Sequence, residues 1–368
     1  MSSELERRLE GMLATAPEPD VGAGEEALGR ALAALRPAAR GRRGFRAVVV
    51  VLAVVALLLA LAAGSLAAAG ALHVSLGARK APATKQLSLP EGANGISALI
   101  DGRLSVVTKG GFRMQGLRAS AGALSPHALY VAAGIGDSLV AMKPDGRQAW
   151  SHGAGGHVVE ISWAPDGLRI AYVVAGKHNS RWTLHLIWGN GTHDETVDRS
   201  VRAVRPSWRA NSLALAYVGA GGRPIVYDLA HASRRVIATR ASGDVRQVAF
   251  APSGRLFAVA TRTQVGLLRP GFNEVDDRGQ IVGIGWTGRW FAVAHGGSHP
   301  VVWLTANPQL GAIHPSGKIE ALDAEGHGIA LAVSAPGVTR VLAAVSGDQP
   351  QTVLQLPGHV TVRDLQLG

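Results

Sequence analysis

Residues 162–173 read S-W-A-P-D-G-L-R-I-A-Y-V: an aromatic residue, a polar turn and then an apolar run. Pro-Asp-Gly between two apolar stretches is typical of a tight turn, so this stretch predicts a β-hairpin whose first strand ends at Trp163. Comparable stretches recur, with Leu124, Trp208, Phe250, Trp286 and Leu322 in the position of Trp163. Successive positions are 36 to 45 residues apart, the length of one four-stranded sheet with its turns. The pattern predicts the repeated sheet, or blade, of a β-propeller.

The two ends of this repeated region complete each other. Residues 360–368, V-T-V-R-D-L-Q-L-G, resemble the first-strand stretch at 244–251, whereas residues 95–117 resemble the second, third and fourth strands of a blade without a first. We therefore predict an all-β, seven-bladed propeller that is closed by the C-terminal strand. Six or eight blades remain open because the repeats are uneven in length.

The stretches S-W-A-P-D-G-L-R-I-A-Y-V and A-F-A-P-S-G-R-L-F-A-V-A resemble the WD40-like repeats of the TolB type, and the resemblance covers roughly residues 95–368. It implies a bacterial, and specifically actinobacterial, propeller. Such propellers serve as binding platforms, as periplasmic assembly factors or as companions of hydrolase domains. This sequence departs from the pattern because it lacks the N-terminal domain of TolB and a catalytic domain after the propeller. Several of its turns also lack Pro-Asp-Gly.

A long apolar segment precedes the propeller. Residues 47–72 form a run of 26 residues without a charge, which is long enough to cross a bilayer as one α-helix. Five arginines (Arg36, Arg40, Arg42, Arg43 and Arg46) precede it, and three basic residues (Arg79, Lys80 and Lys85) follow it. The positive-inside rule therefore predicts a cytoplasmic N-terminus and an extracytoplasmic propeller at the cell membrane. A cleaved signal peptide is the alternative, but 46 residues precede the run, and its apolar part exceeds that of an ordinary signal.

This predicts four parts: a cytoplasmic tail (1–46), a transmembrane helix (47–72), a linker (73–94) and the propeller (95–368). Two short helices are expected in the tail, with apolar stripes at Leu5, Leu9, Met12 and Leu13 and at Leu28, Leu32 and Leu35. The tail either binds a cytoplasmic partner or lies frayed at the membrane surface.

Composition and motifs exclude several functions. The chain has no cysteine, which removes disulfides, thiolate metal sites and Cys nucleophiles. The chain has a net charge of +11 but lacks the dense basic runs with interleaved aromatics that are typical of nucleic-acid-binding proteins, so we expect no nucleic acid as a partner. We expect instead an affinity for anionic headgroups or wall polymers. Residues 283–288, G-I-G-W-T-G, match a dinucleotide fingerprint, yet a strand rather than a helix is expected after them. We find no catalytic motif and predict no enzyme activity, cofactor or metal.

Candidate binding residues come from two kinds of loop that leave a propeller on the same face. One kind leads into each first strand, and the other joins the second strand to the third. The candidates are His157, Arg202, Asp244, Asp277, His314 and His359 from the first kind, and His178, Arg181, Arg223, His295 and His299 from the second. Imidazoles and guanidinium groups together suit an anionic ligand or a partner surface, and less well a metal. The neighbouring residues Asp194-Glu195, Tyr227-Asp228 and Asp276-Asp277 are interpreted as turn and edge residues rather than as acid/base pairs.

The sequence therefore favours a membrane-anchored, non-catalytic platform for an envelope protein, a peptide or an anionic polymer. The alternative is an envelope enzyme, a lactonase- or hydrolase-like propeller with a ligand or metal at the channel mouth.

Overall fold

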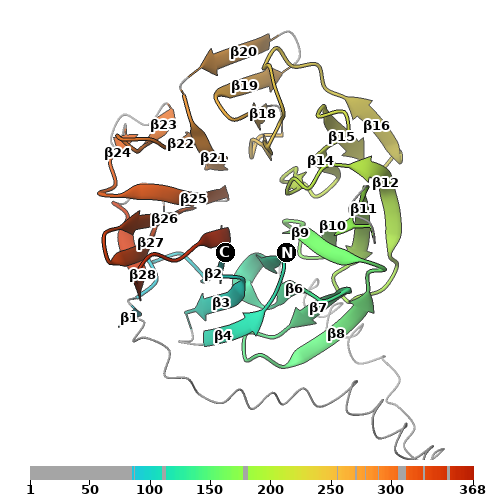
Figure 1. The fold of residues 1–368 in the computed structure, drawn as a ribbon. Coiled ribbons are helices and arrows are strands. Elements are labelled where there is room, and N and C mark those ends of the chain that lie inside the picture. The colour runs from blue at the N-terminus through green and yellow to red at the C-terminus, as the bar shows by residue number, and fades with distance from the viewer. Residues whose placement is uncertain are drawn as a thin grey trace, which may run out of the picture. The chain divides into compact units, whose positions relative to one another are not determined.

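The computed structural model describes residues 85–86, 88–109, 113–176, 181–254, 256–269, 272–277, 279–288, 290–305, 312–325, 328–345 and 349–368. Within these residues the strands form seven sheets that surround a central channel (Figure 1). The prediction of a seven-bladed β-propeller is confirmed. The predicted tail and transmembrane helix lie outside the described residues, as does most of the linker. In the described part of the chain no helix has the length and apolar character needed to span a membrane.

We number the blades in chain order. Blade 1 contains β29 (Val362–Leu367), β2 (Gly95–Ile100), β3 (Arg103–Thr108) and β4 (Arg113–Arg118). Blade 2 contains β5 (Gly122–Leu124), the short 3₁₀ turn η1 (Pro126–Ala128), β6 (Val131–Ile135), β7 (Ser138–Met142) and β8 (Gln148–Gly153). Blade 3 contains β9 (His157–Trp163), β10 (Arg169–Ala175), β11 (Trp182–Trp188) and β12 (Glu195–Val201). Blade 4 contains β13 (Ser207–Trp208), β14 (Ala214–Val218), β15 (Pro224–Asp228) and β16 (Ser233–Val236).

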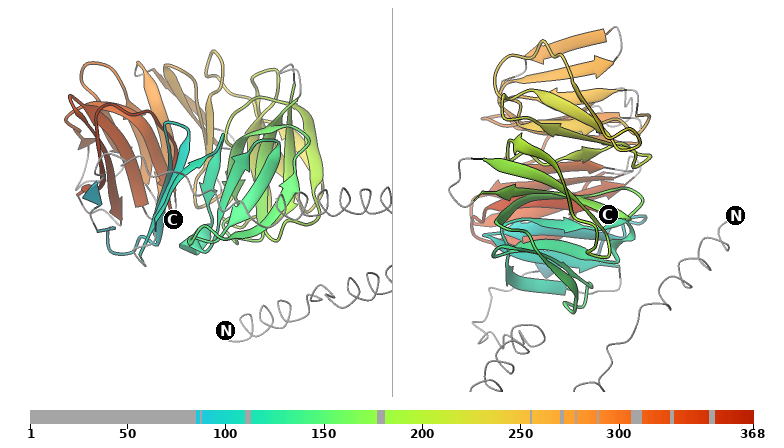
Figure 2. Two further views of the ribbon diagram at one scale, coloured as in Figure 1. Left: turned by 60° about the horizontal axis from the view of Figure 1, so that its bottom comes forward. Right: turned by 90° about the vertical axis from the view of Figure 1, so that its right-hand side faces the viewer.

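Blade 5 contains β17 (Gln247–Phe250), β18 (Phe257–Ala260), β19 (Gln264–Arg269) and β20 (Phe272–Asp277). Blade 6 contains β21 (Ile281–Thr287), β22 (Trp290–His295), β23 (Val301–Thr305) and β24 (Ala312–Ile313). Blade 7 contains β25 (Lys318–Glu325), β26 (Gly328–Ala335), β27 (Val338–Val345) and β28 (Gln351–Pro357), and its outer edge is extended by β1 (Lys85–Gln86). Figure 2 shows from the side that the strands run between the two faces of the ring.

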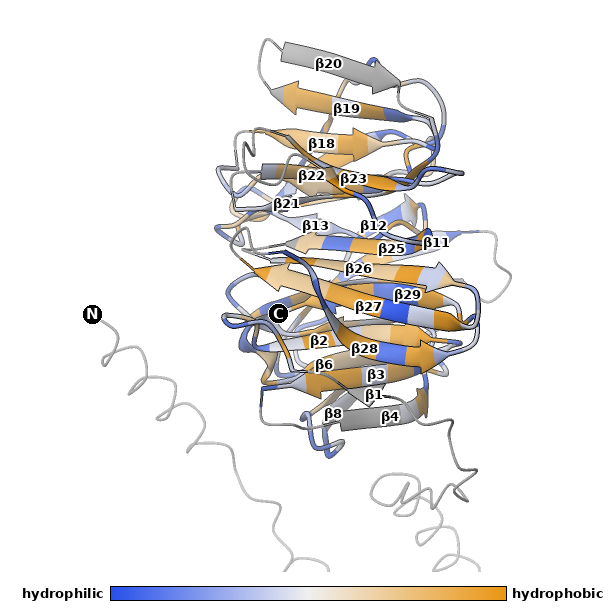
Figure 3. Cartoon of the chain, turned by 90° about the vertical axis from the view of Figure 1, so that its left-hand side faces the viewer, coloured by the Kyte–Doolittle hydropathy of each residue, from blue (hydrophilic) through white to orange (hydrophobic). Residues whose placement is uncertain are grey.

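The second strands of the blades form the most fully buried layer of the propeller. Every residue of β14 and β18 is buried, and β26 is buried up to its last residue. These strands are continuous apolar runs because neighbouring blades cover both of their sides. Figure 3 shows the apolar colour along β18 and β26. Burial between blades therefore holds the ring together.

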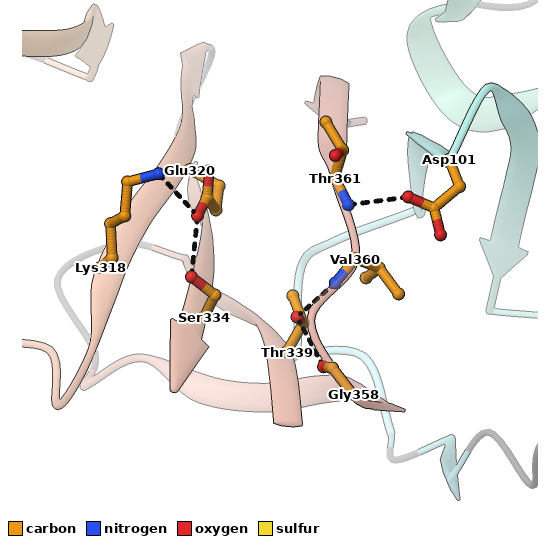
Figure 4. Close-up of polar contacts among 8 residues, drawn as sticks. All are labelled: Asp101, Lys318, Glu320, Ser334, Thr339, Gly358, Val360 and Thr361. Carbon is orange, nitrogen blue, oxygen red and sulfur yellow. Dashed lines mark hydrogen bonds and ion pairs between the residues drawn. The ribbon is translucent and has the colours of Figure 1, made fainter. Parts of the chain in front are cut away.

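The C-terminal strand closes the ring as predicted. β29 pairs antiparallel with β2, placing Leu367 opposite Ile96 and Val362 opposite Ile100. The loop that leads into β29 is held from both sides (Figure 4). Thr361 N–H donates to Asp101 Oδ1 at 2.9 Å on the blade 1 side. On the blade 7 side, Val360 N–H donates to Thr339 Oγ1 at 3.2 Å, and that hydroxyl donates to the Gly358 carbonyl at 3.1 Å.

The glycine motif at 283–288 is structural. Gly283 and Gly285 lie on β21, which packs against β25 of the next blade. A methyl group on Gly283 would lie 2.6 Å from Leu322 Cβ, and one on Gly285 would collide with the Ala324 carbonyl. The motif is followed by strand β22, so the prediction of strand, turn and strand is confirmed.

Candidate functional site

The two faces of the ring differ in which strand ends they carry. Because each sheet is antiparallel, all first strands begin at one face, here called the start face, and finish at the other, the end face. The start face carries the loops between blades and the turns from second to third strands. The end face carries the turns from first to second strands. Side chains from distant blades therefore meet at each face.

A cavity of about 510 Å³ lies at the end-face side of the channel. Its wall contains Trp163, Trp208, Phe250 and Trp286, which are the last or, for Trp286, the last but one residues of four successive first strands. Two of these indoles are fixed across blades: Trp163 Nε1–H donates to the Ala123 carbonyl, and Trp208 Nε1–H donates to the Ser162 carbonyl, each at 3.2 Å. The repeated aromatic position therefore both seals the joints between blades and forms an aromatic cavity.

The cavity wall contains two hydrogen-bond donors, on Gln366 and Trp286, that are available to a ligand. Gln366 Oε1 accepts from Leu124 N–H at 2.7 Å, which fixes the orientation of the amide. Among the described residues, neither its Nε2 nor the Nε1 of Trp286 has a hydrogen-bond partner, and both side chains are more than nine-tenths buried. Arg205 Nη1 lies 3.6 Å from Asp323 Oδ1 in the same wall. The cavity suits an apolar group that brings acceptors such as carbonyl oxygens.

An apolar rim surrounds part of this cavity. We define the apolar rim as Leu129, Leu168 and Leu213, which are 62%, 50% and 47% exposed. Each lies in the turn from first to second strand, in blades 2, 3 and 4 respectively. Pro126 and Pro165 of these turns also line the cavity. Rim and cavity therefore belong to one continuous surface of the end face.

Charged side chains meet inside the channel. Burial raises the pKa of Glu160 on β9 to about 8, and the nearby charge of Asp364 on β29 adds to the effect, while Arg205 and Arg363 oppose it. Burial likewise raises the pKa of Asp364, whose Oδ2 accepts from Gly122 N–H at 3.1 Å. The two carboxyls hold fewer than two negative charges near neutral pH. Sequence reasoning missed this pair, although each is an acidic residue in a first strand.

The predicted binding residues lie around the start face and do not line the cavity. His178 and the side chain of Asp277 lie outside the described residues. Arg202 and Asp244 form an ion pair, with 3.0 Å between Nη1 and Oδ1. His157 Nδ1 lies 3.2 Å from the Gly136 carbonyl of the preceding blade. Two of the predicted residues, Arg202 and Asp244, are therefore in contact. The role of the predicted residues in binding stays a prediction.

The remaining predicted residues are dispersed. His295 is the last residue of β22 and is buried, whereas the sequence placed it in a flexible loop; pairing with Ile281 and Val301 holds it in the sheet. His299 lies in the following turn, with Nδ1 3.1 Å from Ser298 Oγ. His314 lines a smaller cavity of about 300 Å³ beside Arg340. The exposed residues Arg181, Arg223 and His359 each lie in a separate loop.

A second polar cluster, which the sequence did not reveal, lies between blades 2 and 3. Tyr172 O–H donates to Asp194 Oδ1 at 2.6 Å, and the other carboxylate oxygen lies 3.3 Å from His185 Nδ1 and 3.5 Å from His152 Nε2. Burial acts to raise the pKa of Asp194, but the hydrogen bonds from His185 and Tyr172 outweigh it and lower the pKa. In the described residues no three His, Asp or Glu side chains are arranged to hold a metal. The cluster therefore fastens adjacent blades.

The sequence matches no protein-family model and no curated protein. Among solved structures, it is similar to TolB from Acinetobacter baumannii, with 15% identity and a TM-score of 0.47, covering 74% of this chain and 66% of TolB. It is similar to a chain of a nidogen–laminin complex, with 11% identity and a TM-score of 0.45, covering 60% of this chain and 93% of that one. It is also similar to a chain of the mitotic checkpoint complex, with 15% identity and a TM-score of 0.51, covering 69% of this chain and 92% of that one.

At these identities the likeness shows the fold alone. The expected resemblance to TolB-type and WD40-like propellers is thereby confirmed for the architecture.

Proposed function

We propose that this chain is a non-catalytic protein-binding platform of the bacterial cell envelope. Its partner docks on the end face and inserts an apolar side chain into the central cavity. The observation that carries the proposal is the aromatic cavity of about 510 Å³, continuous with three exposed leucines. Exposed apolar patches around a concave pocket are typical of sites where proteins associate.

The chemistry of the cavity supports a peptide group as the occupant. Trp163, Trp208 and Phe250 supply a rigid apolar wall, and Gln366 Nε2–H is a buried donor. An inserted side chain brings its own backbone carbonyl, which can accept from such a donor. Burial of the apolar rim adds a favourable free energy of about 1.5–3 kcal/mol for each leucine that becomes fully covered.

The same proposal places the propeller outside the cytoplasm, held by a helix over residues 47–72. The uncharged run of 26 residues and the arginines before it support this arrangement. Residues 1–46 then form the cytoplasmic tail and can recruit a second partner there. A reporter fused after residue 46 or after residue 368 distinguishes the two sides of the membrane.

Cross-linking in cells tests the binding surface. We expect the triple variant L129S/L168S/L213S to lose roughly tenfold or more of its cross-linked envelope partner. The matched control is Val236→Ser, because Val236 is 54% exposed but lies on the outer strand β16. Equal cross-linking by the wild type, the triple variant and the control would show that the end face is not the docking surface.

A further inference from the structure

The start face carries a basic surface on one side of the ring. We define the basic arc as six arginines: Arg181, Arg202, Arg223, Arg240, Arg246 and Arg262. They lie in the start-face loops of blades 3, 4 and 5, and all except the half-buried Arg202 are exposed. Among the described side chains of these loops, Asp244 supplies a carboxylate. The arc therefore has a large excess of positive charge.

Contacts between the loops join the part of the arc that lies in blades 4 and 5. Arg202 Nε–H donates to the Ala220 carbonyl at 3.3 Å, which joins the loop before β13 to the turn that carries Arg223. Arg202 Nη1 lies 3.0 Å from Asp244 Oδ1, which joins blade 4 to the loop before β17. Ser242 N–H in that loop donates to Gln264 Oε1 at 2.8 Å, beside the turn of Arg262. Four loops from two blades are thus held side by side.

The turns from second to third strand differ in charge around the ring. The turn from second to third strand carries Arg223 in blade 4 and Arg262 in blade 5. The corresponding turns of blades 1 and 2 carry Asp101 and Asp137 instead. The turns from second to third strand therefore contribute a basic residue in blades 4 and 5 and an acidic residue in blades 1 and 2.

We propose that the basic arc binds an acidic segment, a run of Asp and Glu residues, of a partner protein. Every basic residue of the arc is arginine, whose planar guanidinium binds carboxylates through paired hydrogen bonds, whereas lysine acts as a point charge. The arc already binds one carboxylate, that of Asp244 on Arg202. This surface lies on the opposite face from the cavity, so the inference stands independently of the docking proposed there.

Exposed ion pairs are individually weak, so binding depends on several arginines together. The interaction is expected to weaken steeply as salt screens it, since the Debye length falls from about 14 Å at 50 mM to about 6 Å at 300 mM salt. We expect each single-arginine replacement to lower the affinity for the acidic segment. The loss should be larger for an arginine that lies closer to that segment.

The experiment measures fluorescence anisotropy of a labelled peptide of about ten glutamates with the full-length chain in detergent, at about 50 mM and 300 mM NaCl. We expect binding at low salt, and a loss of roughly tenfold or more in affinity for R223E/R262E. The matched control is R147E, because the Arg147 side chain is 74% exposed but lies in the turn between β7 and β8 on the end face. We expect its affinity to stay within about twofold of the wild type.

Three results would overturn the proposal: no binding of the glutamate peptide, an equal loss with R147E, or tighter binding of polyphosphate, nucleic acid or anionic lipid vesicles at matched charge. The last result would assign the arc to a phosphate polymer or a membrane surface. Thermal melting monitors folding of each variant, and R223Q/R262Q replaces the double charge reversal if that variant melts early.

Discussion

At the scale of single residues, Glu160 is an acid whose pKa the fold raises strongly. Burial raises its pKa from 4.5 to about 8 because the charged form loses water around it, and the charge of Asp364 adds to the shift. The folded state therefore keeps a proton that the unfolded chain releases. The free energy of unfolding therefore falls as the pH rises from about 4.5 to about 8.

We predict that Glu160→Gln removes this pH dependence. The wild type should lose unfolding free energy between pH 5 and 8, and the variant should be more stable than the wild type by about 1–2 kcal/mol at the upper end. Urea denaturation at a series of pH values measures the difference. Glu195→Gln serves as the control, since Glu195 is exposed on β12. A wild-type slope that persists in the E160Q variant would contradict this account.

At the scale of elements, the first strands of neighbouring blades lie so close together that large side chains do not fit between them at every position. They do not pair through their backbones in the described sheets. Side chains therefore satisfy inward amides: Gln247 Oε1 accepts from Ile284 N–H at 2.7 Å, and Asp323 Oδ2 accepts from Leu367 N–H at 2.9 Å. Glycines at 283 and 285 allow β21 to approach β25. Small residues and bridging side chains together set the spacing of the blades.

Gly285→Ala tests this spacing. The added methyl group would collide with the Ala324 carbonyl, which is backbone and moves only if β25 shifts. We expect a loss of roughly 2–3 kcal/mol in unfolding free energy. Gly153→Ala on β8 is the matched control, because a methyl group there meets nothing within 4 Å. Chemical denaturation of both variants gives the comparison, and similar stabilities would show that the blades tolerate wider spacing.

At the scale of the whole molecule, β29 decides whether the ring is closed. It supplies the first strand of blade 1 and carries Asp364 and Gln366, which accept backbone hydrogen bonds from blade 2. Without it, β2 becomes an open sheet edge beside the channel, and such edges pair with other chains. The stability of all seven blades therefore depends on seven residues at one end of the chain.

Deletion of residues 362–368 is predicted to abolish the single cooperative melting transition and to produce oligomers. Size-exclusion chromatography and calorimetry measure these effects. The control is deletion of residues 85–86, because β1 is a fifth, outermost strand of blade 7 and closes nothing. A monomeric, cooperatively melting 362–368 deletion would disprove the importance of closure.

The sequence predicted the fold, whereas the binding role of its candidate residues at the start face stays a prediction. The hairpin at 162–173, the seven repeats and the pairing of 360–368 with 95–117 were all confirmed. The candidate residues were derived from a correct idea about which loops share a face, but the cavity lies at the other face. The sequence does not distinguish cavity residues such as Trp163 and Gln366 from ordinary core residues. The residues around them follow the same pattern whether the side chain lines the channel or packs against a neighbouring blade.

The sequence by itself determined the architecture, because turns and apolar strands are properties of neighbouring residues and their spacing repeats. Only the tertiary structure decided which end of the channel is hollow, that Glu160 and Asp364 share one environment, and that Arg202 forms an ion pair with Asp244. These properties arise between residues that are far apart in the chain. Their geometry depends on the spacing and order of the blades around the ring, which no local pattern encodes.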